Sequence, residues 1–198
     1  MHLLIVYCHP SDVSFTRTLL DSFIRGLKTS KHSYELSDLY RMNFRSDMNE
    51  EEYYRESGRE ADKPLPPDIE LEHEKINRAD GLVFIYPVWW SDCPAKMKGW
   101  FDRVYTLGYA YGCEAGKHFT NNLKRIKKAL VICPAGHPLA YLEQIGIAPS
   151  MRKTMIDDRL LGVGIQEAQL IILGGTLAQD PLLEQAHLET AWRLGKDF

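Results

Sequence analysis

The sequence lacks several patterns that would assign it to common classes of protein. It has only four cysteines and no C-x-x-C pair, so neither a zinc site nor a disulfide framework is indicated. Its longest apolar runs, Leu3–Cys8 and Leu82–Trp90, fall far short of the ~20 residues that cross a bilayer. No basic segment precedes the first run and no small-residue cleavage site follows it. We therefore expect no secretory signal and a cytoplasmic location.

A marked excess of charge of one sign is also missing. The chain has 24 Lys and Arg against 27 Asp and Glu, a net charge of −3, whereas nucleic-acid-binding proteins usually carry a basic footprint. The one short basic run, residues 124–128, does not amount to such a footprint. With 198 residues, 44% of them apolar, the chain is long enough to bury a core. We expect a single domain over residues 1–198.

Short, mostly apolar runs alternate along the chain with longer segments of helical periodicity. Five runs predict strands buried in a sheet, namely Leu3–Cys8, Tyr34–Leu39, Leu82–Tyr86, Ala129–Cys133 and Ala168–Leu173. The segments that follow them predict helices, over Phe15–Leu27, Ile69–Arg78, Met97–Leu107, residues 149–162 and residues 181–194. This alternation predicts a doubly wound α/β domain, in which a parallel sheet carries helices on both faces.

Residues 41–67 interrupt the alternation. The segment is polar, rich in Glu and Arg, and closed by three prolines. Another strand–helix unit follows it, so we interpret it as an excursion from the core and not as a linker between domains.

Ligands of such sheets bind beyond the carboxyl ends of the strands, which directs attention to three loops. The first, Cys8–Thr16, contains neither G-x-G-x-x-G nor G-x-x-x-x-G-K. It does place His9 directly after a strand, and the hydroxyls of Ser14 and Thr16 at the start of a helix. Backbone N–H groups and the helix dipole hold phosphate at such a position. The same residues would serve equally well as helix caps and turn residues, and the loop alone does not decide.

The second loop, Tyr86–Pro94, carries two adjacent tryptophans. Neighbouring residues of an extended chain face opposite ways, so Trp89 and Trp90 cannot both enter one core. At least one indole is expected over the carboxyl edge of the sheet, where it can face a flat aromatic ligand. The alternative is that both indoles plug the top of the sheet or a dimer contact.

The third loop, Cys133–Tyr141, contains a glycine and two side chains that can take part in catalysis or binding. Gly136 permits close approach of backbone to a ligand. His137 supplies a group that titrates near neutral pH, and Tyr141 supplies a hydroxyl. A His and a Tyr in a loop are nevertheless more often structural than catalytic.

Taken together, these loops and their spacing resemble the NAD(P)H:quinone oxidoreductase family of flavodoxin-like proteins, the DT-diaphorase type. The resemblance covers most of the chain and is carried by the opening strand with His9 and Pro10, and by residues 14–16, 38–44, 86–90, 94–104 and 108–111. The run Pro87–Val104 is its most specific part. It implies a flavodoxin-like sheet of five strands in the order 2-1-3-4-5.

The resemblance also implies a flavin held by all three loops. The residues that it assigns to the phosphates and ribityl chain are His9, Ser14, Phe15 and Thr16. Those assigned to the isoalloxazine ring are Pro87, Val88, Trp89, Trp90 and Ser91, and those assigned to its pyrimidine side are Cys133, Pro134, Ala135 and Gly136. The start of the excursion, Asp38–Phe44, looks more like the FAD-binding branch of the family, so FAD is favoured and FMN is the alternative.

Catalytic and partner residues follow from the same resemblance. Tyr141 matches a tyrosine that helps to stabilise charge on the flavin ring during hydride transfer, and His137 is a second catalytic candidate. Tyr109 and Tyr111 match a stretch that reaches into the substrate pocket of a partner subunit, which implies a homodimer. Two features depart from the family. Pro134 stands in a segment that is commonly Thr-Thr-Gly-Gly and offers no N–H, and no histidine follows Tyr141 within a few residues.

The prediction is an enzyme that passes a hydride from NAD(P)H through bound flavin to a quinone or similar aromatic acceptor, by a ping-pong two-electron mechanism. A cofactor is needed because no side chain accepts and returns a hydride. Three alternatives stay open: a flavodoxin-type electron carrier, a regulatory ancillary subunit of a potassium-efflux transporter, and a relative that reduces azo or nitro compounds. Cys93 and Cys113 would be redox-sensitive if exposed, although buried, inert thiols are commoner.

Overall fold

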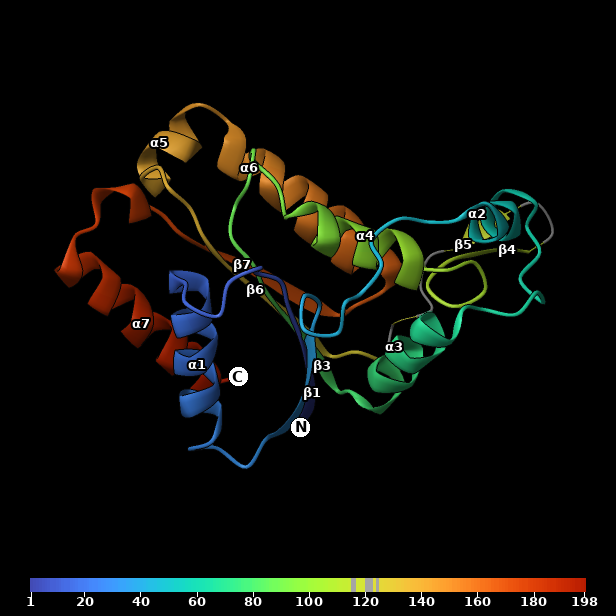
Figure 1. Cartoon of the computed structure of the whole chain (residues 1–198), viewed down its shortest axis with the longest axis horizontal. Helices are drawn as coiled ribbons and strands as arrows, with labels where there is room; N and C mark the ends of the chain where they lie inside the picture. The colour runs from blue at the N-terminus through green and yellow to red at the C-terminus, as the bar shows by residue number, and fades with distance from the viewer. Residues whose placement is uncertain (115–116, 120–122, 124) are drawn as a thin grey trace.

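The computed structural model describes residues 1–114, 117–119, 123 and 125–198 (Figure 1). Five parallel strands form the central sheet in the order β2-β1-β3-β6-β7. Their bounds are His2–Tyr7 for β1, Ser33–Asp38 for β2, Gly81–Ile85 for β3, Lys128–Pro134 for β6 and Glu167–Leu173 for β7. Numbered among themselves, these strands have the order 2-1-3-4-5, so the predicted flavodoxin-like, doubly wound sheet is confirmed.

Alternate residues of β1 enter two separate cores. Leu3 and Ile5 pack in the core that includes residues of α1 (Phe15–Leu27) and α7 (Pro181–Lys196). Leu4 and Val6 belong to the core that includes residues of α3 (Pro67–Arg78) and α4 (Ala95–Val104). The period of two along a strand produces this division. It explains why the first apolar run is unbroken: both faces of the strand are covered (Figure 1).

The segment between β6 and β7 is more helical than the sequence predicts. The third loop includes the start of a short helix, α5 (Leu139–Gln144). The helix expected at 149–162 is α6 (Ile147–Arg152), and it continues into an eight-residue π-helix, η1 (Lys153–Leu160), and a 3₁₀ turn, η2 (Leu161–Val163). A second 3₁₀ turn, η3 (Thr176–Ala178), follows β7. π-Helical turns are rare and often occur at functional sites.

The polar excursion contains a helix that the sequence reading missed, α2 (Glu50–Ser57). Its start is a capping box, in which Asn49 accepts from the Glu52 N–H and Glu52 accepts from the Asn49 N–H. The fully buried side chain of Arg103, on α4, bonds the carboxylates of Glu52 and Asp68 at 2.7 and 2.6 Å. The buried Glu52–Arg103 pair therefore fastens the excursion to α4, and the same arginine joins α4 to α3 through the partly exposed Asp68.

Two smaller features complete the fold. A hairpin of β4 (Gly112–Glu114) and β5 (Lys117–Phe119) was not predicted, and α4 ends at Val104, three residues before the predicted end. The hairpin and α2 lie together at the end of the molecule farthest from α1 and α7 (Figure 1). Within the described residues, no helix has both the length and the apolar character needed to cross a membrane.

Candidate functional site

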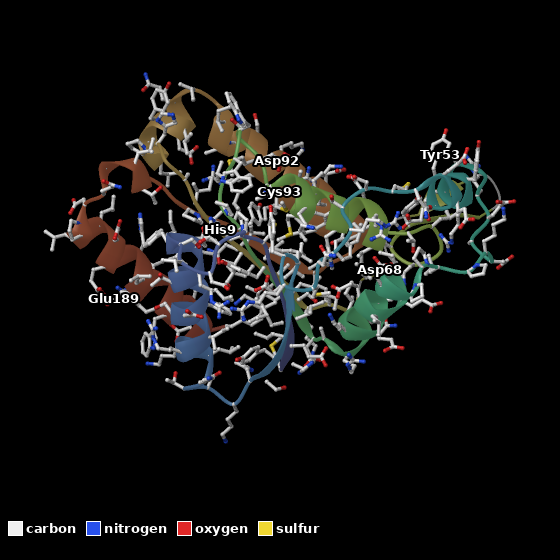
Figure 2. The ribbon with its side chains drawn as sticks, viewed as in Figure 1. His9, Tyr53, Asp68, Asp92, Cys93 and Glu189 are labelled. Atoms are coloured by element: carbon white, nitrogen blue, oxygen red, sulfur yellow. The ribbon has the colours of Figure 1, made fainter. Side chains whose placement is uncertain are left out.

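The three loops singled out by the sequence meet at the carboxyl edge of the sheet. The Val88 N–H donates to the Pro134 carbonyl at 2.9 Å, which ties the second loop to the third. The rings of His9 and Trp89 lie 6.2 Å apart, which brings the first loop to the second. His9, Asp92 and Cys93 lie at this edge, far from Tyr53 on the excursion (Figure 2). The edge is where open α/β sheets bind ligands.

The first loop presents unused hydrogen-bond donors. Ser14 is the N-cap of α1, and its Oγ accepts from the Arg17 N–H at 3.1 Å. The N–H groups of Phe15 and Thr16, in the first turn, have no protein acceptor among the described residues. His9 Nδ1 lies 3.0 Å from the Ser11 N–H and 3.1 Å from the Ser11 carbonyl oxygen, which fixes the ring against the loop. An anion placed at this helix N-terminus would meet the free N–H groups of Phe15 and Thr16.

Beneath this loop lie two buried polar atoms without hydrogen-bond partners. They are the hydroxyl of Tyr7, a residue only 1% exposed, and Nη1 of Arg17. Neither makes a hydrogen bond within the described chain, although Nη1 lies 3.9 Å from carboxylate oxygens of Asp12 and Asp38. Burial raises the pKa of Tyr7 to about 12, so its hydroxyl keeps its proton at neutral pH. Buried polar groups are rarely left unpaired. The Tyr7 hydroxyl is therefore a buried donor that a phosphate-bearing ligand or its bound water would satisfy.

The second loop forms a tight two-residue turn. The Trp89 N–H donates to the Asp92 carbonyl at 3.0 Å, and the Asp92 N–H returns a bond at 3.2 Å. Trp90 and Ser91 have φ angles of +48° and +67°. Non-glycine residues in this left-handed region cost about 1–3 kcal/mol each and cluster at ligand sites. At the turn, Trp90 is fully exposed, Trp89 is 42% exposed, and the N–H groups of Trp90 and Ser91 have no protein acceptor in the described residues.

The sequence allowed the indoles of Trp89 and Trp90 either to face a flat ligand or to plug the top of the sheet or a dimer contact. Neither indole is buried, so they do not plug the top of the sheet in a single chain. A flat ring placed at this edge would meet apolar indole surface and free N–H groups on the same turn. Pro87 is buried and Val88 is half-buried, and both support the turn from below.

The third loop begins with three buried residues. Cys133, Pro134 and Ala135 are buried, so the side chains of Cys133 and Pro134 support the edge from within the sheet. Gly136 packs closely against η3: a Cβ added at Gly136 would lie 2.9 Å from the side chain of Leu177. A larger residue at this position would have to displace that side chain.

His137 and Tyr141 are the exposed members of the third loop. Their rings lie 5.1 Å apart, and 46% of Tyr141 is accessible. The structure thus brings the two catalytic candidates together at the rim of the carboxyl edge. No metal-binding group of three or more His, Cys, Asp or Glu side chains occurs in the described residues.

Sequence reasoning missed one residue of this edge, Arg159 on the π-helix η1. Its Nη1 and Nη2 atoms each lie 3.0 Å from one oxygen of the Asp92 carboxylate. Burial of Asp92 opposes its ionisation, but the bonds from Arg159 and from the Cys93 N–H outweigh burial and lower the pKa of Asp92. Asp92 lies 67 positions earlier in the chain, and no local sequence pattern joins it to Arg159, so the pair could not be predicted.

Tyr109 and Tyr111 do not line the carboxyl edge of their own chain. The Tyr109 hydroxyl donates to Asn77, at the end of α3 and close to the start of β3. The Tyr111 hydroxyl donates to Glu56 of α2 at 2.6 Å. Both hydroxyls are held inside one chain, so any part they take in a ligand site has to be in a partner subunit.

The thiols near the edge are buried. Cys8, Cys93 and Cys133 are at most 7% exposed, and burial raises the pKa of Cys8 and of Cys93 to about 12 and that of Cys133 further. The condition for redox sensitivity at Cys93, exposure, is therefore not met. The side chain of Cys113 lies outside what the structure describes.

A hollow of about 610 Å³ lies elsewhere, in the excursion, and is lined by residues between Asn49 and Pro67. No residue of the three loops reaches it, so it is separate from the candidate site. An open hollow of about 490 Å³ flanks the start of α1, and its lining includes Ser14, Phe15 and the acidic side chains Asp12, Asp21 and Glu184.

Comparison with known proteins gives one consistent result. Residues 1–193 match the sequence family described as having a flavodoxin-like fold. A solved NAD(P)H:quinone oxidoreductase from Methanothermobacter marburgensis is 52% identical with a TM-score of 0.94, and the alignment covers 100% of this chain and 98% of that chain. Curated relatives include an uncharacterized NAD(P)H oxidoreductase of Haemophilus influenzae, 28% identical over 96% of this chain and 92% of the relative. NAD(P)H dehydrogenase (quinone) 1 of Rattus norvegicus is 30% identical over 96% and 77%.

The fold and the loop-lined carboxyl edge define a flavodoxin-like protein. Within that class, the chain belongs to the NAD(P)H:quinone oxidoreductase family and is an oxidoreductase.

Proposed function

We propose that the protein is a flavin-dependent NAD(P)H oxidoreductase that reduces a quinone or a similar small aromatic acceptor. The observation that carries the proposal is the set of free donors at one edge of the sheet. Phe15 and Thr16 offer N–H groups for a phosphate, and Trp90 and Ser91 offer N–H groups beside exposed indole surface. The names of the relatives in the same family support an NAD(P)H-dependent reaction with quinones.

The chemistry that a bound flavin supplies is two-electron transfer, from NAD(P)H in one half-reaction and to the acceptor in the next. In the proposal, the first turn of α1, with His9 and Ser14, binds the phosphate. The turn at Trp90 and Ser91 presents donors to the polar edge of the ring and an apolar surface to its face. Tyr141, with His137 beside it, places a hydroxyl where negative charge is to be stabilised.

The choice between FAD and FMN depends on what lies next to the phosphate-binding turn. The sequence favoured FAD because of the excursion, but α2 packs at the opposite end of the molecule from α1 (Figure 1). The hollow beside Ser14 has room for more of a ligand, and its lining carries both signs of charge: Asp12, Asp21 and Glu184 together with Arg17, which pairs with Asp21 at 3.1 Å. The charges of the hollow therefore do not decide whether a second phosphate would lie there. The start of the excursion does contact the first loop, through the Arg41–Asp12 pair at 2.9 Å, and FAD and FMN are both candidates.

A partner subunit is part of the proposal. The resemblance of Tyr109 and Tyr111 to a partner-reaching stretch supports a homodimer, in which each chain completes the substrate pocket of the other. Because both hydroxyls are already bonded within the chain, these tyrosines would act by presenting ring surface. Sedimentation of the purified protein as a monomer at micromolar concentration would remove the homodimer from the proposal.

The test uses purified protein stripped of any bound nucleotide. FAD and FMN are titrated separately, with quenching of flavin fluorescence as the readout, and the flavin that co-purifies is released and identified by chromatography. We expect saturable binding of one nucleotide and then oxidation of NADH or NADPH that depends on added quinone. Failure to bind either flavin in excess would overturn the proposal. Flavin binding without turnover of NAD(P)H and quinone would favour the electron carrier.

A further inference from the structure

An ion pair with a distant segment holds the turn at the second loop from outside. The Asp92 carboxylate closes the turn and accepts from both terminal nitrogens of Arg159 at 3.0 Å, and from the Cys93 N–H at 2.7 Å. A bidentate contact fixes orientation as well as distance. Asp92 is 47% exposed at its side chain, while the Arg159 side chain is only 12% exposed.

Arg159 is itself fixed by its surroundings. Its guanidinium carbon lies 5.5 Å from the centre of the Phe101 ring on α4, and Nη1 lies 3.7 Å from the Cys93 sulfur. The residue is carried by the π-helix η1, whose turns are wider than those of an α-helix. A buried cation with one carboxylate partner and an aromatic neighbour has little freedom to move.

The turn that this pair closes is strained. Trp90 and Ser91 both adopt left-handed φ angles, a conformation that glycine adopts freely and that other residues resist. Strained turns persist only where the surrounding structure holds them. The cross-turn bonds between Trp89 and Asp92 and the Asp92–Arg159 pair are the contacts that do so.

We propose that Arg159 is a positioning residue for the flavin site, acting through Asp92 to hold the Trp89–Asp92 turn in its strained, ligand-ready conformation. The proposal rests on the proposed function, because the ligand is the flavin assigned above. Without the pair, the turn relaxes, and the N–H groups of Trp90 and Ser91 no longer stand ready at the ring edge. Part of the binding free energy is then spent on ordering the turn.

The first experiment measures flavin affinity. Flavin-free Arg159→Met, Asp92→Asn and the double variant are titrated with the nucleotide that the wild-type protein binds, well below their melting temperatures. We expect each single change to raise Kd about tenfold, and the double variant to add nothing further, because both changes remove the same contact. Lys153→Met is the matched control, since Lys153 lies on the same π-helix and pairs with Asp157 in solvent.

The second experiment separates positioning from a general structural role. Ser91→Gly is placed in the Arg159→Met background, because glycine adopts the left-handed conformation without cost. We expect it to restore most of the lost affinity. It should also restore slow hydrogen exchange at the Trp89 and Asp92 amides in flavin-free protein, which is a readout that needs no bound flavin.

The outcomes are distinguishable. If the wild-type protein binds neither flavin, the proposed function fails, and amide exchange alone still decides whether Arg159 holds the turn. If the wild-type protein binds flavin but Arg159→Met changes Kd less than about twofold and leaves the two amides protected, the positioning role is overturned. Loss of thermal stability with unchanged affinity and no rescue by Ser91→Gly would likewise overturn it.

Discussion

At the scale of single residues, the most direct consequence concerns the hydroxyl of Tyr141. The residue is nearly half exposed and lies beside His137 at the rim of the site. Removing the hydroxyl in Tyr141→Phe takes away one polar contact to developing charge, worth ~1–2 kcal/mol. We expect flavin reduction by NAD(P)H to slow about tenfold, measured by stopped-flow absorbance.

The control for Tyr141→Phe is Tyr53→Phe. Tyr53 is exposed to a similar degree but lies on α2, remote from the three loops (Figure 2). Its variant should reduce flavin at the wild-type rate. An unchanged rate in Tyr141→Phe would remove this residue from the set of catalytic groups, and His137→Gln would then be the next variant to measure.

The buried thiols make a second prediction at the residue scale. A thiol reacts as the thiolate, and burial raises the pKa of Cys8 and Cys93 to about 12. In Cys113→Ser protein, the thiols that remain are Cys8, Cys93 and Cys133, all buried. We expect an aromatic disulfide reagent to label almost none of them at neutral pH, and all three after unfolding in urea. Rapid labelling of one thiol in the native protein would contradict the burial of these sites.

At the scale of the elements, α1 and α7 approach so closely that only glycine fits between them. A Cβ at Gly26 would lie 1.9 Å from the Trp192 carbonyl oxygen, and one at Gly195 would lie 2.1 Å from the Phe23 carbonyl oxygen. Both obstacles are backbone atoms, which cannot rotate away. Gly26→Ala must therefore push the helices apart or distort one of them.

We expect Gly26→Ala to lower the free energy of unfolding by about 1–3 kcal/mol, the cost of overpacking a tight contact. Urea unfolding followed by circular dichroism measures it. Gly162→Ala is the comparison with a wider gap and should cost less, because the nearest atom that a Cβ there would meet, the Asp157 carbonyl oxygen, lies at 3.2 Å. Equal stability of wild type and Gly26→Ala would show that the two helices pack less closely than described.

The elements also show which parts of the fold a single sequence predicts. The strands were found because apolar runs such as Leu82–Tyr86 are buried on both faces, and α1 and α7 because Ser14 and Asp180 cap them. Helix α2 was missed because its buried residues are charged: Glu52 is held by Arg103. Its capping box was visible in the sequence and would have located it.

The site was predicted less completely than the fold, for a physical reason. Loops that follow neighbouring parallel strands must meet at one edge, so the positions of His9, Trp89 and Tyr141 could be expected. Pairing between Asp92 and Arg159 depends on how a π-helix packs on a loop, which periodicity does not encode.

At the scale of the whole molecule, carboxylates join segments that are distant in sequence. Asp92 binds Arg159, Asp68 binds Arg103, and Asp80 accepts from the His2 N–H at 2.8 Å. The pKa of Asp80 is lowered by that backbone bond. For Asp68, burial raises the pKa, but the hydrogen bonds and charge of Arg103 outweigh it and lower the pKa overall. Each of these carboxyl groups binds its proton less readily in the folded chain than in the unfolded one.

The sign of the resulting pH dependence follows from linkage. A lowered pKa contributes stability that is fully present above the unfolded value of about 3.9 and is lost as the pH falls through the folded value. We expect the free energy of unfolding to be level near neutral pH and to fall as the pH drops below about 4. Urea titrations at several pH values measure this acid limb. In Asp68→Asn the free energy of unfolding should fall less steeply as the pH drops below about 4, because one group whose protonation is linked to unfolding is gone. In Asp157→Asn, which removes an exposed pair on η1, it should fall as in the wild type. An unchanged fall of stability with pH in Asp68→Asn would mean that solvent screens the Arg103 contact at this partly exposed carboxylate.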